Sequence, residues 1–356
     1  MTNLDNLKII AKLDRSDMLE TIEGFPAQCR DAKKIGYGFD VPKSFKIQYK
    51  NIVSTGLGGS AIGSDIARSY IADDSKTPLF VNRNYRLPGF VGKETLVIAS
   101  SYSGNTEETI SAYKDAKSKK AKVIAITSGG ELRKLASDDG CPVLAIPGGL
   151  QPRCALGYSF FPLLIILSKI GVVKDRAEDI DEAIEVLNDL KVKSLGPNVP
   201  ENKNIAKTIA RSLYNKFPVI YAGQDHTDSV VTRWRGSLSE NAKVLSSGHV
   251  FPEMNHNEIV GWEYPAKLLK DFTAVILRDS ADFPRVAKRM DITKKILAKT
   301  GVKLIEVNSS GSSLLARIFS LIYIGDFVSF YLAILNKRDP TPVERITYLK
   351  KELAKT

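Results

Sequence analysis

The sequence predicts an α/β protein with two doubly wound parallel-sheet domains and a C-terminal helical tail. Three observations carry this prediction. Short apolar segments alternate with helical sequence along both halves of the chain, a pattern typical of parallel strands joined by helices. Two of these strands end in glycine- or serine-rich turns that run into a helix, as at the ligand-binding edge of such sheets. The chain has 356 residues, 43% of them apolar, and is therefore long enough for two separate cores.

The first domain is predicted over residues 46–175, after a helical segment over residues 1–45. In that leading segment, apolar residues recur at helical spacing over residues 6–28, and the pattern breaks at Gly24. Strands are expected at residues 52–55, 79–81, 95–99, 122–127 and 143–146. The apolar residues 155–168 are too few to cross a membrane, so they predict a buried helix.

The second domain is predicted over residues 205–336, after a charged linker at residues 176–204 that ends in a turn rich in glycine and proline. Its strands are expected at residues 219–222, 272–277 and 303–307, and its helices through Trp234 toward Asn241 and at residues 284–299 and 314–335. Arg317 and Asp326 interrupt the apolar residues 314–335, which favours a buried helix over a membrane span. The tail at residues 337–356 is expected to form a final helix after Pro340 and Pro342.

Charge and cysteine content exclude several classes of protein. The net charge is +11, but the 51 basic residues are spread along the chain among 40 acidic ones, without a basic run that contains aromatic residues. We therefore expect no nucleic-acid partner, whereas a basic surface suits an anionic metabolite. Cys29, Cys141 and Cys154 are too few and too scattered for a disulfide framework or a zinc site. We expect a cytoplasmic protein with reduced thiols.

The clearest candidate site lies at residues 96–109, where an apolar strand runs through small polar residues into a helix. Ser101, Ser103 and Thr106 supply three hydroxyl groups beside Gly104, which permits a tight turn. The helix beginning near Asn105 directs its free N–H groups and the positive end of its dipole toward the same point. The loop has no lysine, so a phosphomonoester fits it better than a nucleoside triphosphate. A simple helix cap would need only one such residue.

The first glycine-rich turn raises the alternative of a dehydrogenase. Gly56, Gly58 and Ala61 satisfy the spacing of a dinucleotide-binding fingerprint. After the second strand, where an NAD site expects an acidic residue for the ribose, the chain has Asn82 and Arg83, which would at best suit NADP. The serine-rich loop is not part of a dinucleotide site. An NADP-dependent dehydrogenase is therefore the less favoured interpretation.

Several motifs together resemble a known family. They are GLGGSA at 56–61, SSYSGNTEET at 100–109, TSGG at 127–130, PRCAL at 152–156, SENAK at 239–243 and PEMNHNE at 252–258. This combination resembles the bifunctional phosphoglucose/phosphomannose isomerases of the sugar isomerase (SIS) domain superfamily. The serine-rich loop is common to the superfamily, whereas the segments around Glu240 and His256 are specific to this branch.

The resemblance implies two flavodoxin-like SIS domains and an aldose–ketose isomerase. Such an enzyme would interconvert glucose 6-phosphate, and mannose 6-phosphate, with fructose 6-phosphate by proton transfer through a cis-enediol. It implies a hexose 6-phosphate as the small-molecule partner and requires no metal or redox cofactor. It also implies a homodimer whose active site lies at the subunit interface, without nucleic-acid or membrane partners.

The resemblance also implies roles for individual residues. The phosphate-binding residues would be Gly58, Gly59, Ser60, Ser101, Ser103 and Thr106. Glu240 would be the base, Arg153 would stabilise the enediolate oxygen, and His256 and Lys350 would open the sugar ring, with His256 acting from the partner subunit. The chain has Asn255 where the family can have a second histidine, and Lys351 is a rival for the role of Lys350.

Three questions stay open from sequence. A small hydroxylated residue is thought to permit turnover of mannose 6-phosphate, and either Thr341 or the position of Val343 corresponds to it. A non-catalytic sensor of sugar phosphates would keep the serine loop without needing Glu240. Ketosamine and arabinose-phosphate isomerases are the enzymatic alternatives.

Overall fold

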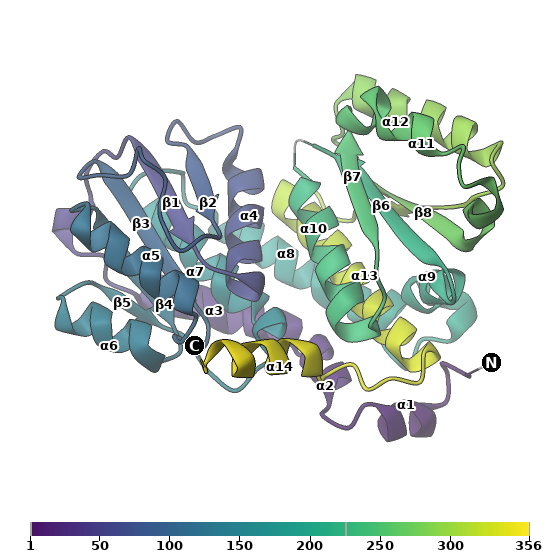
Figure 1. Cartoon of the computed structure of the whole chain (residues 1–356), viewed down its shortest axis with the longest axis horizontal. Helices are drawn as coiled ribbons and strands as arrows, with labels where there is room; N and C mark the ends of the chain where they lie inside the picture. Colours follow the sequence, from purple (N-terminus) through teal and green to yellow (C-terminus); the bar gives the residue numbers. More distant parts are fainter. Residues whose placement is uncertain (1, 225, 356) are drawn as a thin grey trace.

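The chain forms two parallel β-sheets side by side, each flanked by helices (Figure 1). The computed structural model describes residues 2–224 and 226–355. The first sheet has the strand order β2-β1-β3-β4-β5 and the second has the order β7-β6-β8-β9. The strands are β1 Asn51–Thr55, β2 Leu79–Asn82, β3 Thr95–Ser101, β4 Lys122–Thr127, β5 Val143–Ala145, β6 Phe217–Gly223, β7 Ser247–Phe251, β8 Phe272–Arg278 and β9 Lys303–Asn308.

The two sheets share one topology. In each, the second strand in sequence lies outside the first, and the third lies on the other side of the first. Every pairing between neighbouring strands is parallel. The predicted class, two doubly wound parallel-sheet domains, is therefore confirmed.

The core of the second domain is built around helix α13, Leu314–Leu335. Apart from Leu314 and Arg317, every residue of this helix is buried. It is long and apolar enough to span a membrane, but its most apolar window is 100% buried inside the fold. The helix packs against α8, Ala177–Leu190, α9, Ile205–Leu213, and α10, Asp228–Ser237. The prediction of a buried helix is confirmed, and so is that for α7, Leu156–Lys169, in the first domain.

The remaining helices complete the layers around the sheets. In the first domain they are α4 Gly58–Ile71, α5 Glu107–Ser118 and α6 Gly130–Asp138, and in the second they are α11 Glu258–Gly261 and α12 Pro284–Ala298. The tail forms α14, Glu344–Leu353, as predicted, and no residue of this helix is buried. Figure 1 shows α14 running beneath the first domain, far from α11 and α12.

Three segments differ from expectation. The leading segment forms three helices, α1 Leu7–Leu13, α2 Met18–Glu23 and α3 Phe25–Gly38. The last of these was not predicted past Pro26, yet proline is tolerated in a first turn, where the missing N–H is not needed. Part of the segment interpreted as a linker forms α8. Residues 247–251, for which no strand was predicted, form the edge strand β7.

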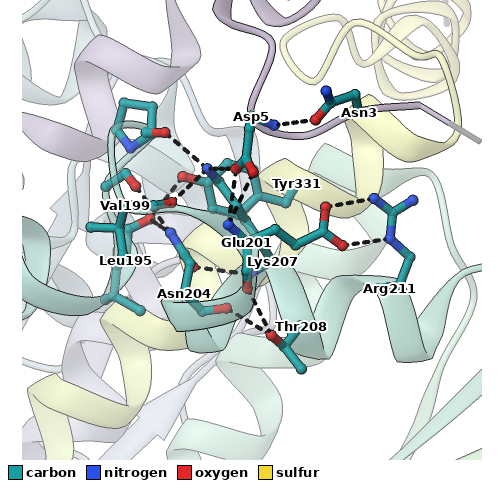
Figure 2. A network of polar contacts seen from close by, with 12 residues as sticks. Asn3, Asp5, Leu195, Val199, Glu201, Asn204, Lys207, Thr208, Arg211 and Tyr331 are labelled. Atoms are coloured by element: carbon teal, nitrogen blue, oxygen red, sulfur yellow. Dashed lines mark hydrogen bonds and ion pairs between the residues drawn. The ribbon is translucent and has the colours of Figure 1, made fainter.

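A buried polar network ties the N-terminal segment to the second domain (Figure 2). The side chain of Lys207 is fully buried and donates to Asp5 Oδ1 at 2.9 Å and to the carbonyls of Pro197 and Val199 at 2.8 Å each. Its ammonium also lies 5.5 Å from the ring centroid of Tyr331 in α13. One lysine therefore connects the N-terminus, the segment after α8, and the core helix.

Candidate active site

The N-terminus of α4 is pressed against the segment that contains Arg153. Helix α4 begins at Gly58, which has φ of +51°. A Cβ on Gly59 would lie 2.2 Å from the carbonyl oxygen of Pro152 and 3.0 Å from the backbone nitrogen of Arg153. Only glycine permits this approach. The glycine-rich turn therefore positions Arg153 beside the start of α4.

The serine-rich loop after β3 lies next to this turn, because β1 and β3 are neighbouring strands. The hydroxyl of Ser60 accepts from the backbone N–H of Tyr102 at 3.1 Å, which joins the two loops. Ser101 Oγ accepts from the N–H of Gly104 at 3.1 Å and donates to Thr106 Oγ1 at 2.9 Å. Ser101 is 1% exposed, whereas Ser103 is exposed.

The tight turn of the serine loop depends on Gly104. This residue has φ of +73°, and a Cβ there would lie 1.8 Å from the carbonyl oxygen of Gly129. Helix α5 begins just after Thr106, whose side chain makes no capping hydrogen bond. The loop hydroxyls and the amides at the start of α4 and α5 thus gather at the carboxyl edge of the first sheet, an arrangement suited to a phosphate. These candidate residues lie either in the first turn of α4 or at the end of β3 and in the turn that follows it, and they are Gly58, Gly59, Ser60, Ser101, Ser103 and Thr106.

Arg153 is the most heavily bonded residue of the candidate site. It is 4% exposed and lies in the 3-10 turn Pro152–Cys154. Its Nε donates to Asn241 Oδ1 at 2.7 Å, and its Nη2 donates to the carbonyls of Pro340 and Thr341 at 3.0 and 2.8 Å. Its Nη1 lies 3.5 Å from Glu240 Oε2. The guanidinium therefore joins the first domain, the segment after α10 and the start of the tail.

Glu240 lies in a π-helical turn, Leu238–Ala242, that continues α10. Such turns widen a helix locally and are frequent at functional sites. The Glu240 side chain is 32% exposed, so it remains open to a ligand while Arg153 contacts it from the buried side. The turn ends at Lys243, which adopts a left-handed backbone conformation with φ of 59°.

Lys243 is a second cation at the site, to which no role was assigned from sequence. Its Nζ donates to the carbonyls of Pro340 and Pro342 at 3.1 and 2.7 Å and to the carbonyl of Glu240. Burial, reinforced by the nearby charge of Arg153, lowers the pKa of Lys243. Its place in the SENAK motif was the only signal in the sequence.

Thr341 and Val343 occupy different environments at the start of the tail. The carbonyl of Thr341 accepts from Arg153, and its Oγ1 is buried without a hydrogen-bond partner among the described residues. Val343 precedes α14, and its backbone carbonyl accepts from the N–H groups of Ile346 and Thr347. Of the two candidates, Thr341 is the one in direct contact with Arg153.

His256 lies at the opposite end of the second domain from Glu240. Glu240 precedes the amino end of β7, whereas His256 follows its carboxyl end in the 3-10 turn Glu253–His256 and is exposed. Lys350 is exposed on α14. Within the described ranges 2–224 and 226–355, neither side chain makes a hydrogen bond or ion pair. A single chain therefore brings together the phosphate loops, Arg153 and Glu240, but not His256.

The residues that could serve an NADP phosphate are engaged elsewhere. Arg83 forms an ion pair with Asp65 of α4. Asn82 is buried and donates to Thr55 Oγ1 at 3.2 Å. Among the described residues, no cluster of three or more His, Cys, Asp or Glu side chains is arranged to hold a metal ion. The dinucleotide interpretation thus gains no support from the structure.

Comparison with known proteins agrees with the geometry. A family model described as the bacterial phospho-glucose isomerase C-terminal SIS domain matches residues 202–353, and a SIS domain model matches residues 47–137. A bifunctional phosphoglucose/phosphomannose isomerase from Caldicellulosiruptor bescii is 49% identical, over 95% of this chain and 99% of that protein. Another with the same name, from Aquifex aeolicus, is 40% identical over 86% of this chain and 91% of that protein.

Solved structures show the same fold at lower identity. A glucose-6-phosphate isomerase-like protein from Thermus thermophilus superposes with a TM-score of 0.62 at 20% identity, covering 96% of this chain and 98% of that one. The C-terminal domain of glucosamine-fructose-6-phosphate aminotransferase from Francisella tularensis gives a TM-score of 0.70 at 16% identity, covering 91% and 98%. At these identities the likeness shows the fold alone.

Proposed function

Since this chain belongs to the family of bifunctional phosphoglucose/phosphomannose isomerases, we propose that Glu240 and Arg153 carry out its proton transfer on a hexose 6-phosphate. The chain is a sugar-phosphate isomerase. The observation that carries the residue assignment is the convergence of the two phosphate loops with Arg153 and Glu240 in one chain. Its substrates are glucose 6-phosphate and mannose 6-phosphate, each interconverted with fructose 6-phosphate in the cytoplasm.

The phosphate would bind between the start of α4 and the serine loop. Ser60, Ser101 and Thr106 supply hydroxyl groups there, Ser103 adds an exposed one, and the amides of Gly58 and Gly59 belong to a helix N-terminus. The hydroxyl of Ser101 donates to that of Thr106, and each of these hydroxyls can rotate to donate to a phosphate oxygen. Holding the phosphate on C6 sets the position of the reacting carbons C1 and C2 relative to Glu240.

Glu240 is the base that moves the proton. In the open-chain aldose, its carboxylate removes the proton from C2, the C1–C2 double bond forms, and the C1 carbonyl oxygen becomes an enediolate oxygen. Arg153 stabilises that negative charge with a guanidinium that cannot lose its proton. Glu240 then returns the proton to C1, and the proton of the C2 hydroxyl passes to the C1 oxygen, so that C2 becomes the ketose carbonyl and C1 carries a hydroxyl. A base in this role typically contributes about 10²–10⁴ in rate.

Turnover of mannose 6-phosphate requires that both C2 epimers reach the same enediol. Because C1–C2 is a double bond in the enediol, one base reaches both faces of C2 only after rotation about C2–C3, which needs space and a polar group near the base. Thr341 supplies the polar group, because its buried hydroxyl has no protein partner among the described residues and its carbonyl is held by Arg153. We therefore assign this role to Thr341 rather than to the position of Val343.

Ring opening would use His256 from the partner subunit of a homodimer, together with Lys350. The exposure of both side chains and the distance of His256 from Glu240 along the fold support this assignment. Helix α14 also exposes Ile346, Tyr348, Leu349 and Leu353, an apolar surface that a partner subunit would cover.

Co-expression of two inactive variants tests the shared site. With Glu240→Gln in one chain and His256→Ala in the other, each mixed dimer has one site with both lesions and one with neither. When half the dimers are mixed, about a quarter of the wild-type activity should return. If mixed dimers confirmed by mass spectrometry are inactive, His256 does not act in the partner's site.

The overall activity is tested with a coupled assay that detects the fructose 6-phosphate formed from either aldose phosphate. Both hexose 6-phosphates should react, and the reaction in deuterated water should place deuterium at C1 of the ketose product. Neither substrate reacting would refute the proposed substrates. Ketosamine and arabinose phosphates serve as the comparison substrates, and a preference for one of them would assign the chain to that class instead.

A further inference from the structure

A buried ion pair lies directly behind the candidate site. It joins Arg233 of α10 to Asp326 of α13, with side chains only 8% and 9% exposed. Arg233 Nη2 lies 2.8 Å from Asp326 Oδ2, and the other carboxylate oxygen accepts from Ser237 Oγ at 2.9 Å. The adjoining cavity of about 10 Å³ has room for no more than one water.

One hydrogen bond connects a side chain of this pair to Arg153, and a second route connects the backbone of Asp326 to the Arg153 side chain. Arg233 Nη1 donates to the backbone carbonyl of Arg153 at 2.7 Å. The side chain of Arg153 is held through Asn241, whose Nδ2 donates to Ser329 Oγ at 3.0 Å, while Ser329 Oγ donates to the carbonyl of Asp326 at 2.8 Å. The backbone and the guanidinium of Arg153 are therefore fixed to the same turn of α13.

Stability alone does not account for this arrangement. A buried ion pair costs much desolvation energy, and well-packed apolar residues in its place are often at least as stabilising. Asp326 is nevertheless the only acidic residue in the 22-residue helix α13. The neighbouring Gly325 lets α10 approach closely, because a Cβ there would lie 2.4 Å from Trp234 Nε1. The packing thus places a charged pair where the helices are closest.

We propose that Arg233 and Asp326 are positioning residues for the isomerase, which hold Arg153 at the distance from Glu240 that catalysis requires. This inference rests on the proposed role of Arg153. At 3.5 Å, the Arg153 Nη1 is near enough to stabilise an enediolate oxygen beside Glu240, while its other nitrogens are fully engaged. If the anchor is lost, the backbone of Arg153 is free to shift, which moves the guanidinium away from this distance to Glu240.

The test replaces the whole pair, with Arg233→Met and Asp326→Leu together, so that no unpaired charge is left in the core. We expect kcat to fall about 10- to 100-fold, the range expected when a catalytic group is misplaced by about 1 Å. The KM for fructose 6-phosphate should stay within about threefold, since the phosphate loops are untouched. Arg233→Lys, which keeps the charge but lacks the forked donors, should give a smaller fall in kcat.

A double-mutant cycle separates positioning from general damage to the fold. In an Arg153→Ala background, the paired substitution should cause no further loss of kcat, because it acts through Arg153. Lys207→Met is the matched control, since it removes a buried cation that contacts none of the site residues and should leave kcat unchanged.

Each outcome decides the proposal. Wild-type kcat in the paired variant and in Arg233→Lys, or an equal loss with and without Arg153, would overturn it. If the paired variant does not fold, the cycle between Arg233→Lys and Arg153→Ala decides by the same criterion. Full activity of Arg153→Ala, or an inactive wild-type protein, would refute the proposed function first and this proposal with it.

Discussion

Gly59→Ala is expected to damage catalysis more than stability, because this glycine sets the distance between the phosphate loops and Arg153. The added Cβ would lie 2.2 Å from the Pro152 carbonyl oxygen and 2.6 Å from its carbon, both of which are backbone atoms. No side-chain rotation relieves this contact. The start of α4 and the turn Pro152–Cys154 must separate by about 1 Å to reach ordinary contact distance.

Two consequences follow from that separation. Overpacking of this kind costs about 1–3 kcal/mol of folding stability, which urea denaturation would measure. A displacement of about 1 Å between substrate and catalytic group can cost about 100-fold in rate, so kcat for fructose 6-phosphate should fall by about one to two orders of magnitude. The KM should rise as well, since Gly59 also belongs to the proposed phosphate site.

Gly236→Ala is the matched control for this prediction. Gly236 lies within α10, near the site, and a Cβ there would meet nothing within 4 Å. The substitution should stabilise the protein by about 0.4–1 kcal/mol through the unfolded chain and leave kcat unchanged. A Gly59→Ala protein with wild-type kcat and wild-type stability would show that this close approach does not position Arg153.

Four further predictions concern single side chains. Glu240→Gln should lower kcat by about 10²–10⁴ while sugar-phosphate affinity, measured by calorimetry, stays near that of the wild type; near-native turnover would remove Glu240 from the mechanism. Thr341→Val should lower activity on mannose 6-phosphate more than on glucose 6-phosphate, whereas Val343→Thr should leave the ratio unchanged, and equal losses on both substrates would contradict the assignment. Lys207→Met should cost about 3 kcal/mol, because it leaves buried carbonyls unpaired, with kcat unchanged. The hydrogen bond from Lys207 lowers the pKa of Asp5, and burial opposes it with a smaller effect. At neutral pH the wild-type protein should therefore be more stable than Asp5→Asn. This difference in stability should disappear as the pH falls through the lowered pKa of Asp5, and a difference that persists in acid would contradict this linkage.

The fold was predictable where local pattern and tertiary environment agree. Helix α13 has the bounds expected from its apolar run because all of its residues except Leu314 and Arg317 are buried and no surface face interrupts the pattern. The sequence of helix α8 indicated a linker instead, since its many acidic residues obscure Ile180, Ala183, Ile184 and Leu187, which recur at helical spacing and are buried. Strand β7 was missed because it is a short, half-buried edge strand that contains Gly248 and His249.

In the candidate site too, the features with a local sequence pattern were predictable and those that depend on distant contacts were not. The two phosphate loops are local motifs, and each could be recognised within about ten residues of sequence. The contact between Arg153 and Glu240 spans 87 positions, so only the family resemblance could place them together. Arg233 and Asp326 carried no sequence signal except that Asp326 interrupts an apolar run. Buried charges of this kind become interpretable only when their partners are known.

The duplicated topology poses a last question, which is why only the first domain would bind phosphate. The second domain also has a serine-rich loop, at residues 309–313, immediately before α13. Here the carboxylate of Glu182, from α8, accepts from the N–H groups of Ser312 and Ser313 at 2.6 and 2.8 Å. Burial alone would raise the pKa of Glu182, but hydrogen bonds from Ser313 and Ser312 lower it. The anion at this helix N-terminus is thus a side chain of the protein itself, which joins α8 to the core helix. This difference between the domains supports the proposal that the substrate phosphate binds at the first domain's loops.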